Sequence, residues 1–230
     1  MPNFLQIKLI NKTFNIGKET AVVALCDVSL TVSQGDFVVL SGPSGSGKTT
    51  LLNIVGGLDD ATSGEVTLDG LRLTGLSEFA LSKVRRDHIG FVFQAYNLIP
   101  VLTARENIEY VMRLQGKSSQ KCKERSQDLA SRLGIDTLLS KLPNQLSGGQ
   151  QQRVAVARAV AATPKLILAD EPTANLDSKA AESLMDMMQR LNQEEGVTII
   201  FSSHDPLVIG KAKRSIVLKD GEVTVDDRVC

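Results

Sequence analysis

The sequence has few cysteines: Cys26, Cys122 and Cys230 are the only ones among 230 residues, and they lie far apart. This spacing excludes a CxxC metal site and a disulfide framework, and it fits a reducing cytoplasmic compartment. An excess of either charge is also missing, because 26 Lys and Arg residues balance 26 Asp and Glu residues. No overall positive field therefore favours nucleic acid or an anionic membrane, and binding to either would need a local patch.

Long apolar runs are absent as well, since nowhere do 18 or more apolar residues follow one another. The first residues do not form a basic-then-apolar signal segment. We therefore expect a chain that neither spans a membrane nor is exported by that route, and that serves any membrane as a separate subunit. Its 230 residues, 42% of them hydrophobic, suit one compact unit or one domain that carries a subdomain.

The most informative stretch has the G-x-x-x-x-G-K-[ST] pattern of a phosphate-binding P-loop: Gly42, Pro43, Ser44, Gly45, Ser46, Gly47, Lys48 and Thr49. A strand-like run, 37–40, precedes it and a helix-like run, 50–55, follows, as the motif requires. In such a loop, backbone N–H groups and the positive end of the helix bind a polyphosphate. Lys48 then reaches the β- and γ-phosphates, and Thr49 completes the shell of a Mg²⁺ ion.

The competing interpretation of this stretch is a Gly/Ser-rich turn between two elements, which the strand and helix on either side disfavour. The pattern predicts a nucleoside triphosphate as the ligand. By itself it does not separate kinases, GTPases, motors and transport ATPases.

Two antiparallel strands are predicted ahead of this loop, at 4–10 and 24–32, because apolar and polar residues alternate there. Phe14 lies between them and is either a core aromatic or a platform for a purine ring. After the loop, 77–86 has a helical pattern. The charged run 83–88 at its end indicates either a solvated face or a binding patch.

Two carboxylates follow the apolar run 166–169, and a pair of acids at the end of a buried strand is costly unless it is used. Hydrophobic residues followed by acids form the Walker B pattern. Asp170 is predicted to hold Mg²⁺, directly or through water, and Glu171 to polarise an attacking water.

Two further polar residues follow predicted buried strands: Gln94 after 89–93 and His204 after 197–201. Ligands of open α/β sheets bind at the carboxyl ends of strands, so these residues are expected on the same sheet edge as Glu171. His204 is otherwise a satisfied core histidine. At the end of the chain, 215–218 and 222–225 form a hairpin signal.

Helix signals dominate the segments that connect the predicted strands at 89–93, 166–169 and 197–201. Thr103 opens a capping box, and Ser178 is predicted to cap a helix that Gly196 ends. Within the stretch 146–150, Ser147 either serves only as the cap of the next helix or leaves free N–H groups as a second anion site.

Taken together, these motifs resemble the nucleotide-binding subunit of ATP-binding-cassette (ABC) transporters, over essentially the whole chain. The matching residues follow the family's order: the Walker A loop 42–49, the Q-loop residue Gln94, the signature Leu146, Ser147, Gly148, Gly149 and Gln150, the Walker B run 166–170, the base Glu171, the D-loop 174–177 with Asp177, and the switch histidine His204. The signature discriminates best, because other P-loop classes lack it. The family's adenine-stacking aromatic falls on Phe14, which favours the platform interpretation.

The resemblance implies an α/β fold, with a P-loop NTPase (RecA-like) core, an antiparallel β-subdomain and an inserted α-helical subdomain. We expect one ABC ATPase domain over 1–230, in which 1–94 and 163–230 form the catalytic core with the β-subdomain, and 95–162 form the helical signature subdomain. The implied cofactors are ATP and Mg²⁺. The implied contacts with ATP are Phe14, Gly42, Pro43, Ser44, Gly45, Ser46, Gly47, Lys48, Thr49 and Thr50, and those with the metal are Thr49, Gln94 and Asp170.

The resemblance also implies a mechanism. Two copies pair head to tail on binding ATP, and the signature of one copy covers the γ-phosphate that Lys48 of the other holds. Hydrolysis then uses Glu171 on the attacking water, His204 on the γ-phosphate, and Gln94 on the metal and water. Movement at Gln94 would relay the nucleotide state to a membrane partner docked near 95–102.

Residues 91–100 and 102–107 look like the subgroup that serves lipoprotein release and macrolide export, although amino-acid importers and the cell-division ATPase carry similar phrases. The resemblance implies an ATPase that powers a separate integral membrane permease subunit. It implies a location in the cytoplasm, peripheral on the inner face of the cell membrane, and no nucleic acid as a partner.

Two other functions remain open at this stage. A soluble ABC ATPase that acts on nucleic acid or ribosomes usually holds two cassettes or a long coiled coil, whereas this sequence has one cassette and a short interval. A P-loop small-molecule kinase would leave the stretch 147–149 and His204 without explanation.

Overall fold

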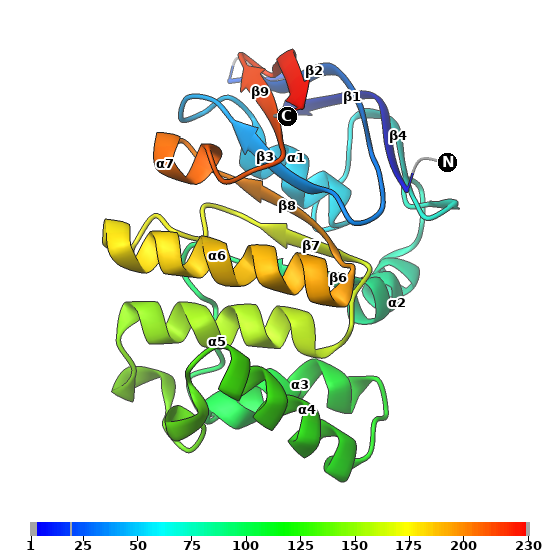
Figure 1. Ribbon diagram of the computed structural model, residues 1–230. Helices are drawn as coiled ribbons and strands as arrows, with labels where there is room; N and C mark the ends of the chain where they lie inside the picture. Colours follow the sequence, from blue (N-terminus) through cyan, green and yellow to red (C-terminus); the bar gives the residue numbers. More distant parts are fainter. Residues whose placement is uncertain (1–3, 19, 229–230) are drawn as a thin grey trace.

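Two β-sheets organise the chain in the computed structural model, which describes residues 4–18 and 20–228 (Figure 1). The larger sheet has six strands in the order β10-β9-β3-β8-β7-β6, and all but β10 run parallel. These strands are β3 (Phe37–Ser41), β6 (Ile89–Val92), β7 (Leu166–Ala169), β8 (Thr198–Ser202), β9 (Arg214–Lys219) and β10 (Glu222–Arg228). Every residue of β3, β7 and β8 is buried, as expected for parallel strands covered on both faces.

The smaller sheet is antiparallel, with the order β2-β1-β4-β5. Its strands are β1 (Leu5–Phe14), β2 (Val22–Val32), β4 (Ser63–Leu68) and β5 (Leu71–Arg72). The first strand continues to Phe14, beyond the predicted range 4–10. The pairing of β1 with β2 shifts register three times after Ile7, and Leu9 has a φ of 48°. Such bulges break the alternation of apolar and polar residues, so the sequence pattern shows only the first half of the strand.

Seven α-helices occur in the described residues: α1 (Lys48–Val55), α2 (Glu78–His88), α3 (Ala104–Leu114), α4 (Ser119–Arg132), α5 (Gly148–Ala161), α6 (Ser178–Glu195) and α7 (Pro206–Ile209). Two short 3₁₀ turns, Asp136–Leu138 and Pro143–Gln145, lead from α4 to α5. Figure 1 shows α6 along the parallel sheet, α5 beyond it, and α3 and α4 farthest from the sheet. No helix in the described part of the chain is long and apolar enough to cross a bilayer.

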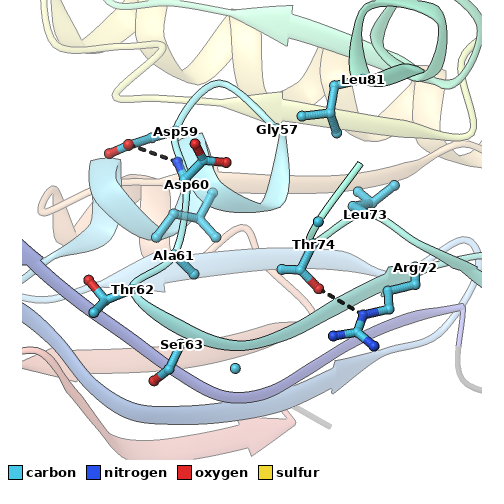
Figure 2. Close-up of a pocket in the computed structure, with 13 residues that line it drawn as sticks. Gly57, Asp59, Asp60, Ala61, Thr62, Ser63, Arg72, Leu73, Thr74 and Leu81 are labelled. Atoms are coloured by element: carbon cyan, nitrogen blue, oxygen red, sulfur yellow. Dashed lines mark hydrogen bonds between the residues drawn. The ribbon is translucent and has the colours of Figure 1, made fainter. Parts of the chain in front are cut away.

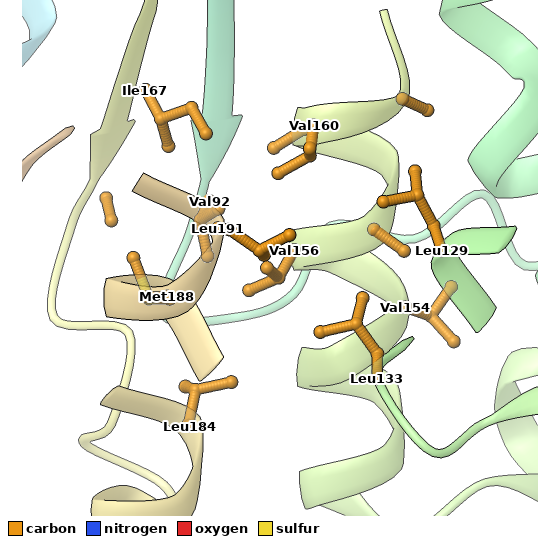
Figure 3. Packing of buried hydrophobic residues seen from close by; sticks show 14 of the residues in the cluster. Val92, Leu129, Leu133, Val154, Val156, Val160, Ile167, Leu184, Met188 and Leu191 are labelled. Atoms are coloured by element: carbon orange, nitrogen blue, oxygen red, sulfur yellow. The ribbon is translucent and has the colours of Figure 1, made fainter. Parts of the chain in front are cut away.

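Helix α5 is buried on two sides (Figure 3). Val156 and Val160 pack toward the parallel sheet and α6, whereas Val154 lies beside Leu129 and Leu133 of the α4 region. This explains why the sequence of α5 is rich in Ala and Val rather than amphipathic, because a helix with a single buried face would need a polar stripe. The apolar cluster is continuous from the sheet through α5 to α3 and α4.

A second apolar cluster fills the space on the opposite face of the parallel sheet. It joins the core faces of the antiparallel strands to α1, whose Leu51, Leu52 and Ile54 are buried. The phosphate-loop segment 42–47 lies between β3 and α1, so this cluster anchors the elements on both sides of it. The predicted α/β architecture, with an antiparallel sheet and an inserted set of helices, is confirmed.

Several helix caps were predicted from sequence, and one was wrong. Thr103 and Ser147 each form a capping box, in which the backbone N–H of the cap residue donates in return to the side chain of the third helical residue. The cap of α6 is Asp177 rather than Ser178, because the Asp177 carboxylate accepts a hydrogen bond from the N–H of Ala180 at 2.9 Å.

Candidate functional site

The loop 42–47 leaves the carboxyl end of β3 and enters α1, as the P-loop pattern predicts. Two of its glycines have contrasting surroundings. Gly42 has a φ of 137°, and a Cβ placed on it would lie 2.0 Å from the carbonyl oxygen of Leu218 in β9. Gly45 has a φ of 78° and no atom within 4 Å of such a Cβ. The loop is therefore pressed against the sheet at one end and open to a ligand at its tip.

Lys48 points its ammonium group back into this loop. The side chain is buried, and Nζ donates to the carbonyl oxygens of Gly42 at 2.8 Å and Pro43 at 2.9 Å. No side chain caps the first turn of α1, which follows Gly47. The start of α1 thus offers uncapped N–H groups next to a fixed cation, which is an arrangement suited to an anionic group.

Asp170 lies opposite the start of α1. Thr49 Oγ1 donates to its carboxylate, 2.9 Å from Oδ2 and 3.1 Å from Oδ1. Asp170 follows the last residue of β7, and β7 is separated from β3 by β8 alone. The fold therefore places a hydroxyl and a carboxylate side by side from segments 121 residues apart.

Glu171 and His204 also meet at this sheet edge. Nδ1 of His204 lies 2.9 Å from Oε1 of Glu171, and the histidine side chain is 68% exposed whereas that of the glutamate is 16% exposed. The exposure of His204 excludes the alternative of a satisfied core histidine. Glu171 has a φ of 44°, a left-handed conformation that costs a residue with a side chain about 1–2 kcal/mol.

The remaining predicted nucleotide contacts lie at the surface or near it. Phe14 ends β1 and is 39% exposed, so it is not a core aromatic, and the ammonium of Lys12 lies 4.7 Å from the centre of its ring. In the loop, Pro43, Ser44 and Gly45 are exposed, and Thr50 in α1 is half-buried. The buried hydroxyl of Ser46 has no hydrogen-bond partner among the described residues.

Gln94 lies just beyond β6, and its side chain is exposed. Its backbone carbonyl accepts a hydrogen bond from Nδ2 of Asn175 at 3.0 Å. The described contacts include no hydrogen bond from the side chain of Gln94 to Asp170 or Glu171. The structure therefore brings together Thr49, Asp170, Glu171 and His204, and leaves the Gln94 side chain apart from them.

The signature residues form a separate feature at the start of α5. Ser147 caps the helix, and with Gly148, Gly149, Gln150 and Asp177 it borders a hollow of about 540 Å³. No residue of the loop 42–47 lines this hollow, and neither does Glu171 or His204. Leu146, the first residue of the signature, is buried and does not line the hollow. Within one chain, the signature and the phosphate loop thus belong to two different surfaces.

Another hollow, of about 240 Å³, lies at the far end of α1 (Figure 2). Asp59 and Asp60 line it on one side, with Arg72 and Thr74 on the other. None of the predicted site residues borders it, and we assign it no role.

The comparison with known proteins decides the family. Residues 25–174 match the family described as ABC transporter. The chain belongs to the ABC transporter family. Within it, the chain is 45% identical over 229 residues to an uncharacterized ABC transporter ATP-binding protein, MJ0796, of Methanocaldococcus jannaschii, covering 98% of this chain and 97% of that one.

Two other relatives in the ABC family carry names that state a function. The lipoprotein-releasing system ATP-binding protein LolD 1 of Chlorobium chlorochromatii is 42% identical over 228 residues, covering 98% of this chain and 93% of that protein. The macrolide export ATP-binding/permease protein MacB of Syntrophobacter fumaroxidans is 47% identical over 223 residues, which are 96% of this chain and 31% of MacB.

A solved structure of the MJ0796 cassette resembles this ABC protein closely, with a TM-score of 0.91, 44% identity, and coverage of 98% of this chain and 99% of that one. It is described as dimeric, in a post-hydrolysis state, bound to ADP and Pi. The match confirms the predicted P-loop NTPase fold. Together with the family, it identifies this chain as an ABC ATPase domain.

Some residues around the site of this ABC protein were missed by sequence reasoning. Ser202, at the end of β8, contacts both Asp170 and Glu171 through its hydroxyl. Arg158 of α5 donates to the carbonyl oxygens of Tyr96 at 2.9 Å and Asn97 at 2.5 Å, and burial lowers the pKa of its guanidinium. For Ser202 the sequence offers only a polar residue after the apolar run 197–201, and its link to Asp170 requires the order of the strands. The position of Arg158 depends on a loop conformation that no sequence pattern indicates.

Proposed function

We propose that this chain is the ATP-binding and ATP-hydrolysing subunit of an ABC transporter, and that the residues of the phosphate loop and the sheet edge form its reaction site. The observation that carries the proposal is the placement of Thr49 of the loop within 2.9 Å of Asp170, next to the contact between Glu171 and His204. A phosphate-binding loop, a metal-binding pair and a base then lie along one edge of the sheet.

In this proposal the loop 42–47 and the start of α1 hold the triphosphate through backbone N–H groups, and Phe14 offers its exposed ring to the adenine. Lys48 moves its ammonium from the carbonyl oxygens of Gly42 and Pro43 to the β- and γ-phosphates, where it offsets developing negative charge. These carbonyl contacts keep the ammonium inside the loop until a phosphate replaces them.

Mg²⁺ fits the oxygens present. The Thr49 hydroxyl and the Asp170 carboxylate are hard oxygen donors, and Mg²⁺ is usually held by one or two carboxylates together with substrate phosphates rather than by a full protein cage. This agrees with the described residues, which include no cluster of three or more His, Cys, Asp or Glu side chains suited to a metal. When bound, the ion supplies charge neutralisation on the phosphates. Gln94, whose side chain lies apart from these residues in the structure, would have to turn toward the ion from the end of β6.

Glu171 acts on the attacking water in this proposal, by orienting it and accepting its proton. His204 contacts the γ-phosphate and, at 2.9 Å from Glu171, also limits where the glutamate can lie. Because the histidine side chain is 68% exposed, it is available to a ligand at the sheet edge.

The signature completes the site only in a pair of chains. Ser147 and the glycines that follow it border a hollow that contains no residue of the phosphate loop, so one chain cannot place them on its own triphosphate. We propose that two copies bind ATP head to tail, with the signature and Asp177 of one chain facing the loop of the other. The description of the MJ0796 cassette as dimeric with ADP and Pi supports this arrangement.

The membrane partner has a candidate docking site on the same molecule. A hollow of about 380 Å³ is lined by Leu58, Phe91, Phe93, Tyr110 and Leu114, with Arg86 and Arg158 among its borders. Its apolar surface and cations suit an apolar permease segment that carries an acidic residue. The relative MacB is an ATP-binding/permease protein, which supports a permease as the partner of this chain.

The location, the cargo and the internal division of the chain are further parts of the proposal. We propose that the chain is cytoplasmic and lies peripherally on the inner face of the membrane, and that its transporter handles lipoprotein or hydrophobic compounds, as the names LolD and MacB suggest for those proteins. Residues 95–162 then act as the helical signature subdomain between the two parts of the core.

The substitution Glu171→Gln tests the reaction site. We expect ATP binding to persist and turnover to fall at least about 100-fold, because the amide cannot accept the proton of the water. ATP should then trap a dimer, which light scattering detects. Glu65→Gln on β4, where Glu65 pairs with Arg72 at the surface, is the matched control and should turn over normally. Wild-type turnover in Glu171→Gln would remove Glu171 from this role.

The substitution Ser147→Arg tests the shared site. We expect the monomer to bind ATP normally and the ATP-dependent dimer to be lost, because the longer side chain occupies the hollow that the partner's nucleotide must approach. Ser118→Arg is the control, since Ser118 caps α4 in the same manner and borders no part of this hollow. A normal ATP-dependent dimer in Ser147→Arg would contradict the arrangement.

A further inference from the structure

Ser202 occupies a protected position next to the Asp170 carboxylate and the backbone of Glu171. It is the last residue of β8 and has no exposed surface. In the pairing of β7 with β8, Ala169 lies opposite Phe201, so the residue after Ala169 lies at the level of Ser202. On its other side, Ser202 pairs with Leu40 of β3, the strand that leads into the phosphate loop.

The Ser202 hydroxyl makes two hydrogen bonds, one as acceptor and one as donor. It accepts the backbone N–H of Glu171 at 2.8 Å and donates to Oδ1 of Asp170 at 2.7 Å. A serine hydroxyl has one hydrogen to donate, so Asp170 takes its full donor capacity. Because the group is buried, water does not replace either bond without a change in packing.

The bond to Glu171 holds a conformation that the backbone does not favour. Glu171 has a φ of 44°, and such strain persists only where the surroundings fix it. The acceptor for its N–H is a side chain rather than a strand partner, so the geometry at this residue depends on the Ser202 hydroxyl. A rotation there would swing the Glu171 carboxylate relative to His204.

The bond to Asp170 has a different consequence. The other described donor to this carboxylate is Thr49, which belongs to the start of α1 and is itself a proposed metal contact. When Thr49 turns its hydroxyl oxygen to a metal ion, Ser202 still holds Asp170 from the side of the sheet.

We propose that Ser202 is a positioning residue for ATP hydrolysis, whose single hydroxyl fixes both the Asp170 carboxylate and the backbone of Glu171. The proposal rests on the roles proposed above for these two carboxylates. Ser202 is buried, so in this proposal it acts through Asp170 and Glu171 and not by contact with the nucleotide. It acts by keeping the base and the metal-binding carboxylate in register, and a displacement of about 1 Å at such a group costs on the order of 100-fold in rate.

The test is Ser202→Ala, which removes both bonds and leaves the packing of a small side chain. We expect kcat for ATP to fall about 10- to 100-fold with KM changed less than about threefold, because binding by the loop is not affected. Ser202→Thr keeps the hydroxyl and should recover kcat to within about threefold of the wild type. ATP-dependent dimer formation, measured by light scattering, should persist in both variants.

Ser203→Ala is the matched control. Ser203 is equally buried and adjacent, but its hydroxyl accepts the N–H of Asp205 and contacts neither carboxylate. Ser203→Ala removes one hydrogen bond where Ser202→Ala removes two, so it should lower the melting temperature less, while kcat stays within twofold of the wild type. A fall in kcat that is equal in the two alanine variants would overturn the proposal, and so would a threonine variant that melts like the wild type but turns over as slowly as Ser202→Ala.

The outcomes of Ser202→Ala and Glu171→Gln distinguish a failure of this proposal from a failure of the proposed function. If Glu171→Gln turns over like the wild type, the reaction site itself is wrongly assigned. If Glu171→Gln is inactive and Ser202→Ala has normal kcat, the reaction site stands and only the role of Ser202 is refuted.

Discussion

Among the three glycines of the phosphate loop, Gly42 has the least room for a side chain. A Cβ there would lie 2.0 Å from the carbonyl oxygen of Leu218, about 1 Å closer than real contacts of this kind allow. Because that oxygen belongs to the backbone of β9, no side-chain rotation relieves the contact. The loop or the strand would have to move.

The cost of Gly42→Ala follows from two contributions. A residue with a side chain at a φ of 137° loses about 1–3 kcal/mol through backbone strain. Forcing an extra carbon into a packed region adds about 1–3 kcal/mol. We therefore expect the free energy of unfolding to fall by about 2–6 kcal/mol.

Gly45→Ala isolates the first contribution. Gly45 also has a positive φ, of 78°, but nothing lies within 4 Å of its added Cβ. Strain alone should cost about 1–2 kcal/mol, partly offset by a less flexible unfolded chain. The difference between the two variants then reports the contact with β9 together with any difference in strain between the two φ values.

The measurement is urea unfolding at 25 °C without nucleotide, because bound ATP would stabilise the folded state by mass action. Circular dichroism before urea addition shows whether each variant starts folded. The free energies of unfolding are comparable if they fall with urea concentration at the same slope in both variants. Equal losses in Gly42→Ala and Gly45→Ala, or a smaller loss in Gly42→Ala, would refute the reasoning.

Two further predictions concern the helices. Burial raises the pKa of the Glu195 carboxyl, but hydrogen bonds from Arg125 and Arg132 outweigh it and lower the pKa overall. The stability that Glu195 adds is therefore present above its unfolded pKa of about 4.3 and lost as the pH falls below it. Urea midpoints of the wild type and Glu195→Gln should converge between about pH 5 and pH 3, and a constant gap would contradict this. Leu129→Ala, in the buried cluster beside α5, should cost about 2–5 kcal/mol in urea unfolding, whereas Val101→Ala, at a side chain that is 79% exposed, should cost almost nothing.

Much of the fold was predictable because local patterns match it. The strand, loop and helix around Lys48, the capping box at Thr103, the helix cap at Ser147, and the hairpin of β9 and β10 all follow from spacing within a few residues. The family resemblance supplied the order of motifs, which the comparisons confirm at the level of the family. The roles of individual site residues stay predictions.

The features that sequence reasoning missed depend on long-range contacts or on local strain. Nothing in the sequence around Glu171 signals a left-handed backbone, because glycine or asparagine is the usual residue there. The link from Ser202 to Asp170 joins segments 32 residues apart and needs the order of strands to be known. The wrong cap of α6 has a different, local origin, since Asp177 and Ser178 are adjacent and both are good caps.

The burial of α5 on two opposite sides has a consequence for how the protein unfolds. Its apolar side chains face the sheet in one direction and α3 and α4 in the other, so removing the outer helices would uncover one flank and removing the sheet would uncover the other. Neither portion has a closed hydrophobic interior when it is separated from its neighbour. Thermal melting should therefore be a single cooperative transition, and a protease cut between α4 and α5 should release no fragment that keeps its own fold.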